Sequence, residues 1–133
     1  KNNIILVEHD EDDDMFLLSA ATSGKTNIIF SSEMIKSYKD FDACLTVCVK
    51  CESVTMIKKV MRSLPCSVDF IIVNRIDLMD NNFSKKERGA QIKGHVSMLA
   101  SKKILNGANM IITSCSTEYS LRDLANSFLN LRK

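Results

Sequence analysis

The segment from Phe70 to Val73 constrains the fold most strongly, because it is uncharged and ends abruptly in polar residues. Three of its four side chains are β-branched, which is typical of a parallel strand buried on both faces. In open α/β sheets, ligand-facing residues lie just beyond the carboxyl ends of such strands. Asn74 and Asp77 follow this run and are therefore the first candidate site residues.

Similar apolar runs alternate with segments of helical periodicity along the whole chain. The patterns predict further strands at 3–7, 27–31, 41–49 and 109–113, and helices at 12–21, 52–64, 85–105 and 119–131. The run at 41–49 is almost entirely apolar, which predicts a central strand. The alternation predicts an α/β fold in one domain, residues 1–133: a doubly wound, mainly parallel sheet of five or six strands with helices on both faces.

Composition narrows the class of protein without assigning a function. The chain of 133 residues is long enough for a real core, and its net charge of +2 does not by itself imply a nucleic-acid or membrane partner. No apolar run approaches the roughly 20 residues that span a bilayer. The five cysteines predict buried thiols in an intracellular, reducing compartment. The isolated pair Cys48 and Cys51 leaves a zinc site as an alternative, but our prediction is no metal.

Residues 74–77, Asn-Arg-Ile-Asp, resemble the guanine-reading Asn-Lys-x-Asp motif of Ras-like small GTPases, with Arg75 in place of the Lys. Residues 113–116, Thr-Ser-Cys-Ser, resemble the Ser-Ala-Lys loop of the same family, with Ser114 matching its Ser. Residues 41–43 and 51–54 resemble the central strand and following helix, so the resemblance extends over 41–131. It implies that Asn74, Asp77 and Ser114 occupy base-reading positions.

The first third of the chain departs from that family. A phosphate-binding loop needs Gly-x-x-x-x-Gly-Lys-[Ser/Thr] directly after the first strand, whereas residues 8–15 read Glu-His-Asp-Glu-Asp-Asp-Asp-Met. Each carboxylate about 4 Å from a phosphate charge costs roughly 4 kcal/mol at an effective dielectric constant near 20. Gly24-Lys25-Thr26 follows a helix instead, so it is interpreted as a turn.

The switch regions of a small GTPase also have no counterpart. Residues 8–40 leave too little chain for them, and no Asp-x-x-Gly follows a strand. The resemblance therefore implies a pseudo-GTPase: a small-GTPase-like scaffold lacking switch regions, without catalytic residues or a cofactor. Asn74, Asp77 and Ser114 would be relics of the base-reading site.

The compressed order of strands resembles the centromere protein M family of inner-kinetochore pseudo-GTPases. That resemblance implies a non-catalytic interaction subunit with protein partners, namely centromere proteins I, H and K, and a nuclear, kinetochore location. It implies neither a membrane nor a small-molecule substrate, and it leaves direct contact with nucleic acid open.

Two other functions remain as alternatives. One is a divergent protein that still binds guanine nucleotides. The other is a receiver-like signalling domain, because residues 5–13 resemble the first strand and magnesium-binding carboxylates of response regulators. A receiver also needs a phosphoacceptor Asp after its third strand and a Lys after its fifth. This chain has Lys-Cys at 50–51 and Ser-Cys-Ser at 114–116 instead, so two of the three chemical parts of a receiver are missing.

Each of the remaining polar features can be explained either by a purely structural role or by a functional one. The acidic run is expected to be a solvated helix N-terminus, with a partner-facing patch or a divalent-ion site as alternatives. His9 and His95 stand alone, and Ser114 and Cys115 lack an evident base for nucleophilic catalysis. A basic cluster is expected to be a solvated face or a docking face for an acidic protein or DNA; it comprises Lys85, Lys86, Arg88, Lys93, Lys102 and Lys103.

Overall fold

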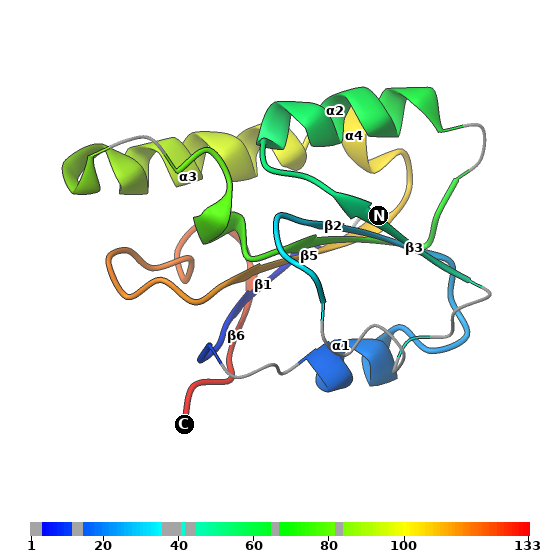
Figure 1. Ribbon diagram of the computed structural model, residues 1–133, viewed down its shortest axis with the longest axis horizontal. Coiled ribbons are helices and arrows are strands. Elements are labelled where there is room, and N and C mark those ends of the chain that lie inside the picture. The colour runs from blue at the N-terminus through cyan, green and yellow to red at the C-terminus, as the bar shows by residue number, and fades with distance from the viewer. Residues whose placement is uncertain (1–3, 12–14, 36–40, 42–44, 65–66, 82–83) are drawn as a thin grey trace.

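The computed structural model describes residues 4–11, 15–35, 41, 45–64, 67–81 and 84–133, which form one sheet between two layers of helices (Figure 1). The strands are β1 (Ile4–Glu8), β2 (Asn27–Ser31), β3 (Thr46–Lys50), β4 (Phe70–Asn74), β5 (Asn109–Ser114) and β6 (Ser127–Asn130). The helices are α1 (Met15–Ala21), α2 (Val54–Ser63), the 3₁₀ turn η2 (Ile76–Leu78), α3 (Lys85–Leu99) and α4 (Lys102–Leu105).

All six strands are parallel, in the order β3-β2-β4-β5-β1-β6. The predicted doubly wound, parallel α/β fold is therefore confirmed, with the sixth strand present. The common doubly wound orders place β1 beside β2 or β3, whereas here β4 and β5 separate β1 from β2. The acidic residues after β1 consequently lie beside the end of β5.

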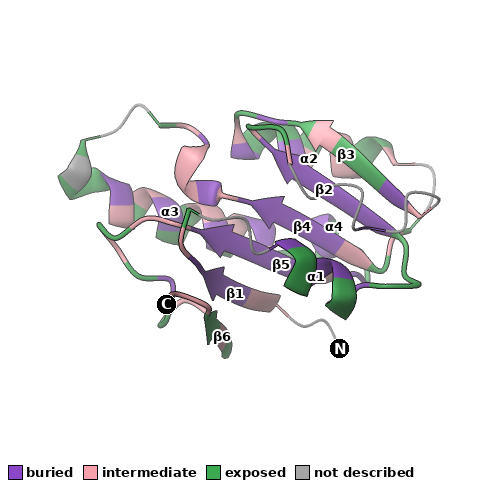
Figure 2. Ribbon diagram, turned by 60° about the horizontal axis from the view of Figure 1, so that its bottom comes forward, coloured by how far each residue is buried: buried purple, intermediate pink, exposed green. Residues whose placement is uncertain are grey.

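Alternating side chains of the sheet enter two cores, as the pleat requires. On one face, Ile29, Ile72 and Ile111 pack with Met15 and Leu18 of α1. The opposite face is covered by α2, α3 and α4, on the far side of the sheet from α1 (Figure 1). Figure 2 shows that β4 and β5 are buried along almost their whole length. Each fully buried aliphatic side chain contributes about 1.5–3 kcal/mol, so these two strands anchor the site at their ends.

The helices agree with the periodicity but are shorter than predicted. The segment predicted as one helix at 85–105 is divided into α3 and α4, with the cap of α4 formed by the Ser101 hydroxyl, which accepts a bond from the Ile104 amide. Residues 12–14 of the first predicted helix lie outside the described residues. No described helix is long and apolar enough to cross a membrane.

The prediction of a helix at 119–131 was wrong. That segment makes a series of turns and then forms β6, which pairs with the outer side of β1. Serine hydroxyls accept bonds from amides two residues ahead, at Ser116, Glu118 and Arg122. Such local side-chain bonds compete with helical backbone bonds. The apolar residues Leu121 and Phe128 still reach the core, so the periodicity detected burial but not its geometry.

The prediction that 41–49 is a central strand was also wrong. The strand is β3, it begins at Thr46, and it lies at the edge of the sheet beside β2. Val47 is 59% exposed, so an apolar run here marks an open edge rather than a buried centre. Residues 42–44 lie outside the described residues.

The cysteines are less uniform than predicted. Cys51 is buried, Cys115 is half-buried and Cys48 is exposed, which corrects the expectation of buried thiols at Cys48. Cys44 and Cys66 lie outside the described residues. In the part of the chain that the structure describes, no three His, Cys, Asp or Glu side chains gather as a metal site.

Candidate functional site

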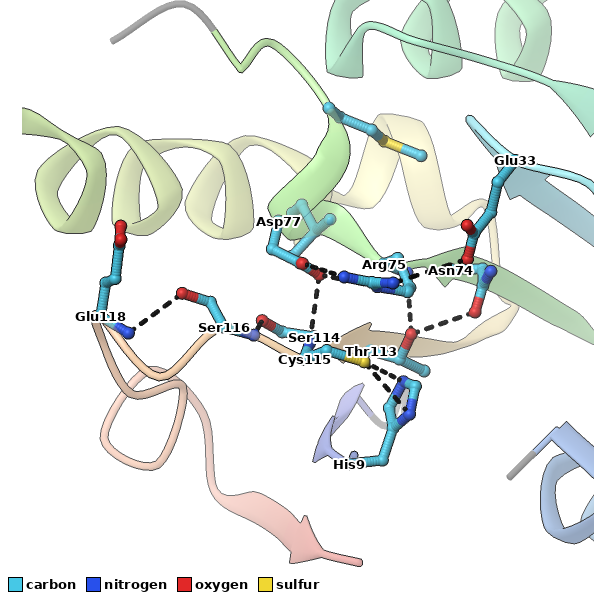
Figure 3. A network of polar contacts seen from close by, with 12 residues as sticks. His9, Glu33, Asn74, Arg75, Asp77, Thr113, Ser114, Cys115, Ser116 and Glu118 are labelled. Atoms are coloured by element: carbon cyan, nitrogen blue, oxygen red, sulfur yellow. Dashed lines mark hydrogen bonds and ion pairs between the residues drawn. The ribbon is translucent and has the colours of Figure 1, made fainter. Parts of the chain in front are cut away.

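Polar side chains from the ends of β2, β4 and β5 form one connected set at the carboxyl edge of the sheet. We call it the carboxyl-edge network (Figure 3); it comprises Ser31, Asn74, Arg75, Asp77, Thr113 and Cys115. The parallel register aligns the strand ends, since Ser31 pairs with Asn74. The structure thus brings together the predicted positions Asn74 and Asp77 with the loop after β5.

The Asn74 side chain ties three strands together. Its Nδ2 donates to Ser31 Oγ at 3.0 Å, and its Oδ1 accepts from Thr113 Oγ1 at 3.2 Å. The same Thr113 oxygen accepts from the Arg75 amide at 2.8 Å. Asn74 is only 4% exposed, so both ends of its amide are used in holding the sheet edge.

Arg75 and Asp77 close on each other within one short loop. Arg75 has a φ of 55°, a left-handed conformation that few non-glycine residues adopt. From there its Nη2 donates to Asp77 Oδ2 at 2.8 Å, and its Nη1 lies 3.7 Å from Glu33 Oε1. The side chains of this pair are only 14% and 9% exposed. Burial lowers the pKa of the Arg75 guanidinium, whereas the hydrogen bond to Asp77 and its negative charge raise it, and the net result is a raised pKa.

The loop after β5 completes this closure. The Cys115 amide donates to Asp77 Oδ1 at 3.1 Å, so both carboxylate oxygens of Asp77 are engaged. Ser114 is buried, and its hydroxyl accepts from the Ser116 amide at 3.2 Å. All three sequence-predicted positions, Asn74, Asp77 and Ser114, therefore bond within the chain.

Arg88, a buried residue of α3, bonds to the backbone carbonyls of the loop around η2. Arg88 is 5% exposed, and its guanidinium donates to the carbonyls of Asp77, Met79 and Asp80 at 2.8, 2.7 and 3.0 Å. It also donates to the Gln91 side chain. Carbonyl groups of a non-repetitive loop need such partners when buried. The assignment of Arg88 to an exposed basic cluster was therefore wrong.

An open, polar pocket of about 490 Å³ lies over this loop. Arg75, Asp77 and Arg88 form one side, and the loop after β5 forms the other, including Cys115 and Tyr119. The carboxyl ends of neighbouring parallel strands whose connections leave on opposite faces are the usual place for ligands. Arg75 and Asp77 bond to each other and Arg88 bonds to the loop carbonyls, so these three side chains present few free donors and acceptors to a ligand.

The structure places His9 beside Cys115, a contact that sequence reasoning missed. The Cys115 Sγ atom lies 3.3 Å from Nδ1 and 3.5 Å from Nε2 of His9. A sulfur aligned with the lone pair of one ring nitrogen would lie much farther from the other, so neither nitrogen is placed in line for proton transfer. Burial raises the pKa of the Cys115 thiol to about 12, with Arg75 acting in the opposite direction. The contact packs the thiol rather than activating it.

Cys115 is accordingly expected to react at least tenfold more slowly with iodoacetamide at pH 7.4 than a free cysteine in solution. At a pKa of about 12 its thiolate fraction is about a thousandfold below that of a thiol at 9.0, and only part of that is offset by higher intrinsic nucleophilicity. Mass spectrometry of peptides after timed alkylation measures the rate. Reaction of Cys115 faster than the free thiol would show an activated nucleophile instead.

Two acidic residues at the end of β1, Glu8 and Asp10, bond within the chain, which corrects the expectation of a solvated run at its start; Glu11 is exposed, and residues 12–14 lie outside the described residues. Glu8 is buried; its Oε2 accepts from the Leu121 amide at 2.7 Å, and its Oε1 lies 3.4 Å from Arg132. Asp10 Oδ2 accepts from the Lys133 amide at 3.0 Å. Residues 131–133 therefore lie across the end of β1, where a phosphate-binding loop would follow the first strand.

The Gly24-Lys25-Thr26 segment is a turn at the opposite edge of the sheet. Gly24 has a φ of 76°, and the Thr26 amide and hydroxyl both donate to Asp69 Oδ2 at 2.9 Å. These bonds lower the pKa of Asp69. Because Thr26 precedes β2 and Asp69 precedes β4, this turn lies a full strand length from the carboxyl-edge network.

His95 on α3 provides a pH-dependent contribution to stability. Burial lowers its pKa below 6.5, although Asp80 Oδ2 at 3.8 Å favours the charged form. The unfolded chain therefore binds more protons than the folded chain at mildly acidic pH, so stability present above 6.5 is lost as the pH falls.

Urea unfolding between pH 7.5 and 5.5 is expected to show this loss in the wild-type chain and a flatter profile in His95→Gln. Gln cannot gain a proton, so the linkage disappears whatever its effect on absolute stability. Equal slopes for the two proteins over this range would contradict the assignment of the titration to His95.

The basic cluster is divided by the structure. Lys86, Lys93, Lys102 and Lys103 are exposed on α3 and α4, which agrees with a solvated face, whereas Arg88 belongs to the site. The docking interpretation of the exposed lysines stays a prediction.

Four positions of the site escaped sequence reasoning as site residues: Ser31, Glu33, Thr113 and Arg88. A signal existed for Thr113, because Ser31, Asn74 and Thr113 are polar residues that each end an apolar run, and parallel strands bring such ends together. Nothing in the sequence distinguishes Arg88, which is buried, from the exposed lysines of the same helix.

Comparison of the chain with protein-family models found no matching family. Comparison with curated proteins found no significant match. The structure itself shows a parallel, GTPase-like α/β fold, and the polar residues at the carboxyl edge of its sheet bond to one another.

Proposed function

We propose that the chain is a non-catalytic, small-GTPase-like scaffold that acts as an interaction subunit of a protein assembly. The observation that carries this proposal is the state of Asp77. Its carboxylate is bonded by Arg75 and by the Cys115 amide, whereas a guanine-reading carboxylate must accept bonds from the base. Binding a base here would require the Arg75–Asp77 pair to open.

The end of β1 supports the same proposal. A nucleoside polyphosphate needs free backbone amides and a cation after the first strand, but here the carboxylates of Glu8 and Asp10 occupy that place and hold residues 131–133. A polyanion would have to displace Arg132 and would face the two carboxylates.

The resemblance to centromere protein M extends this proposal to an inner-kinetochore assembly in the nucleus. The partners would be centromere proteins I, H and K, bound without nucleotide because no switch segment is available to gate the interaction. The support is the compressed order of sequence features, together with base-reading positions that bond within the chain.

Isothermal titration tests the absence of nucleotide binding. GTP or GDP with Mg²⁺, titrated into the purified chain at about 50 μM, is expected to give only heats of dilution. Heat that fits a micromolar dissociation constant would overturn the proposal in favour of a divergent guanine-nucleotide-binding protein, for which the polar pocket beside Asp77 is the evident site.

Co-elution tests the proposed partners. The chain mixed with a purified complex of centromere proteins I, H and K is expected to elute with it in size-exclusion chromatography, equally with and without GTP. Elution of the chain at its own volume in all conditions would overturn the kinetochore assignment. The nucleotide titration would then remain as the test of the more general scaffold proposal.

A further inference from the structure

The outer edge of β3 is one of the two edges of the sheet. β3 has five residues, contains neither a proline nor a bulge, and among the described strands pairs with β2 alone; Cys48 and Lys50 are exposed. Exposed edges of this kind are normally blocked because they template pairing with another chain. The single charged residue, Lys50, stands at the carboxyl end, so most of the edge is accessible to an extended segment.

The backbone geometry shows which groups are offered. The Leu45 carbonyl accepts from the Asn27 amide, and the Cys51 amide donates to the Ser31 carbonyl. Because backbone groups alternate in direction along a strand, Val47 and Val49 also bond toward β2. The N–H and C=O groups of Cys48 and Lys50 consequently point outward. Water satisfies these groups in the free chain, and the backbone of another extended strand can replace that water along the whole row.

A groove beside the carboxyl half of β3 adds side-chain specificity. It measures about 600 Å³ and is predominantly apolar, with Met34, Ile35, Cys48 and Val49 among its lining residues. Met34 is 90% exposed. Lys50 and Glu33 both line the groove, and the Glu33 carboxylate is paired with Arg75 at 3.7 Å, which leaves Lys50 as the lining charge available to a ligand. The groove suits an apolar side chain followed by an acidic one.

We propose that β3 is a docking edge for an extended segment of a partner protein, which adds a seventh strand and places an apolar side chain in the groove and an acidic residue beside Lys50. This rests on the proposed function as an interaction subunit and names its surface. Strand addition supplies affinity through main-chain bonds and specificity through alternate side-chain pockets. A second copy of the chain is the weaker occupant, since pairing through five residues falls short of the roughly 800 Å² per partner of a stable interface.

Selection from a phage-displayed library of randomised ten-residue peptides tests the proposal on the purified, reduced chain. The selected peptides are expected to alternate apolar and polar residues and to contain an acidic residue. Hydrogen exchange at the Cys48 and Lys50 amides is expected to slow at least tenfold when a selected peptide is added, while amides already bonded to β2 change little.

Variants separate the backbone edge from its surroundings. Cys48→Pro removes the outward N–H without removing a bond to β2, and is expected to weaken a selected peptide at least tenfold in fluorescence anisotropy. Cys48→Ser keeps that N–H and should bind as the wild type does. Lys50→Glu should weaken binding about fivefold, whereas Lys103→Glu, the same charge change on α4, should not. If Cys48→Pro fails to fold by circular dichroism, the Lys50 pair and the exchange data decide.

Three results would overturn the proposal: no peptide selected above background, equal binding by folded Cys48→Pro, or a wild-type dimer in sedimentation equilibrium that Cys48→Pro dissociates. The last would assign the edge to a second copy. Nucleotide binding in the titration described above would refute the proposed function but leave the peptide result standing, so the two failures are distinguishable.

Discussion

Replacing Arg88 by Met is expected to lower the free energy of unfolding by about 3–5 kcal/mol, the range for losing a buried charged group that satisfies several partners. Met fills most of the volume, so packing loss is small. The cost arises because the carbonyls of Asp77, Met79 and Asp80 lose their donor inside the protein. These carbonyls belong to the loop that carries Asp77, so the same substitution should loosen the carboxyl-edge network.

Urea unfolding followed by circular dichroism measures this effect, with Lys93→Met as the matched control. Lys93 is an exposed base on the same helix, and its replacement should change stability by less than about 0.5 kcal/mol. Arg88→Lys should fall between the two, since an ammonium carries the charge but cannot span the carbonyls as the planar guanidinium does. A loss below about 1 kcal/mol for Arg88→Met would show that water satisfies the loop.

The three strands β2, β4 and β5 could be predicted from sequence because they are buried on both faces, unlike the edge strands β3 and β6. Residues 27–31, 70–74 and 109–114 carry uninterrupted apolar runs, and such runs report burial directly. The order of the strands could not be predicted in the same way. Whether β1 lies beside β2 or beside β5 depends on packing between distant segments, and both neighbours are equally apolar.

The error at 119–131 has a specific long-range cause. The Leu121 amide donates to the carboxylate of Glu8, 113 residues earlier in the chain. The outer side of β1 was available for pairing, and β6 occupies it. Spacing of apolar residues cannot reveal a strand edge that needs a partner, so the periodicity predicted a helix.

The sequence predicted where the candidate site lies, but not that its side chains bond to one another. Asn74 and Asp77 were expected after a buried strand and lie there, joined to the end of β5 at Thr113 and to the following loop at Cys115. The sequence could not indicate that Arg75 adopts a left-handed conformation and folds back onto Asp77. That local closure is the physical difference between a site that reads a base and one that bonds to itself.

Replacing Asp77 by Asn is expected to lower the free energy of unfolding by about 2–3 kcal/mol, because a hydrogen bond to a charged group is worth more than a neutral one and its partner is left partly buried. The Asn oxygen still accepts from the Cys115 amide, so the loss reports on Arg75. That guanidinium would keep only Glu33, at 3.7 Å. The control is Asp123→Asn, at an exposed acidic residue, with an expected change below about 0.5 kcal/mol.

A double-mutant cycle with Arg75→Met isolates the pair from the rest of the loop. If Arg75 and Asp77 hold each other, the double variant should lose less than the sum of the single losses by at least about 1 kcal/mol. Moderate salt should change this coupling little, because both side chains are shielded from solvent. Additive losses would mean that Asp77 is free to accept other donors, and the case for a self-bonded site would fail there.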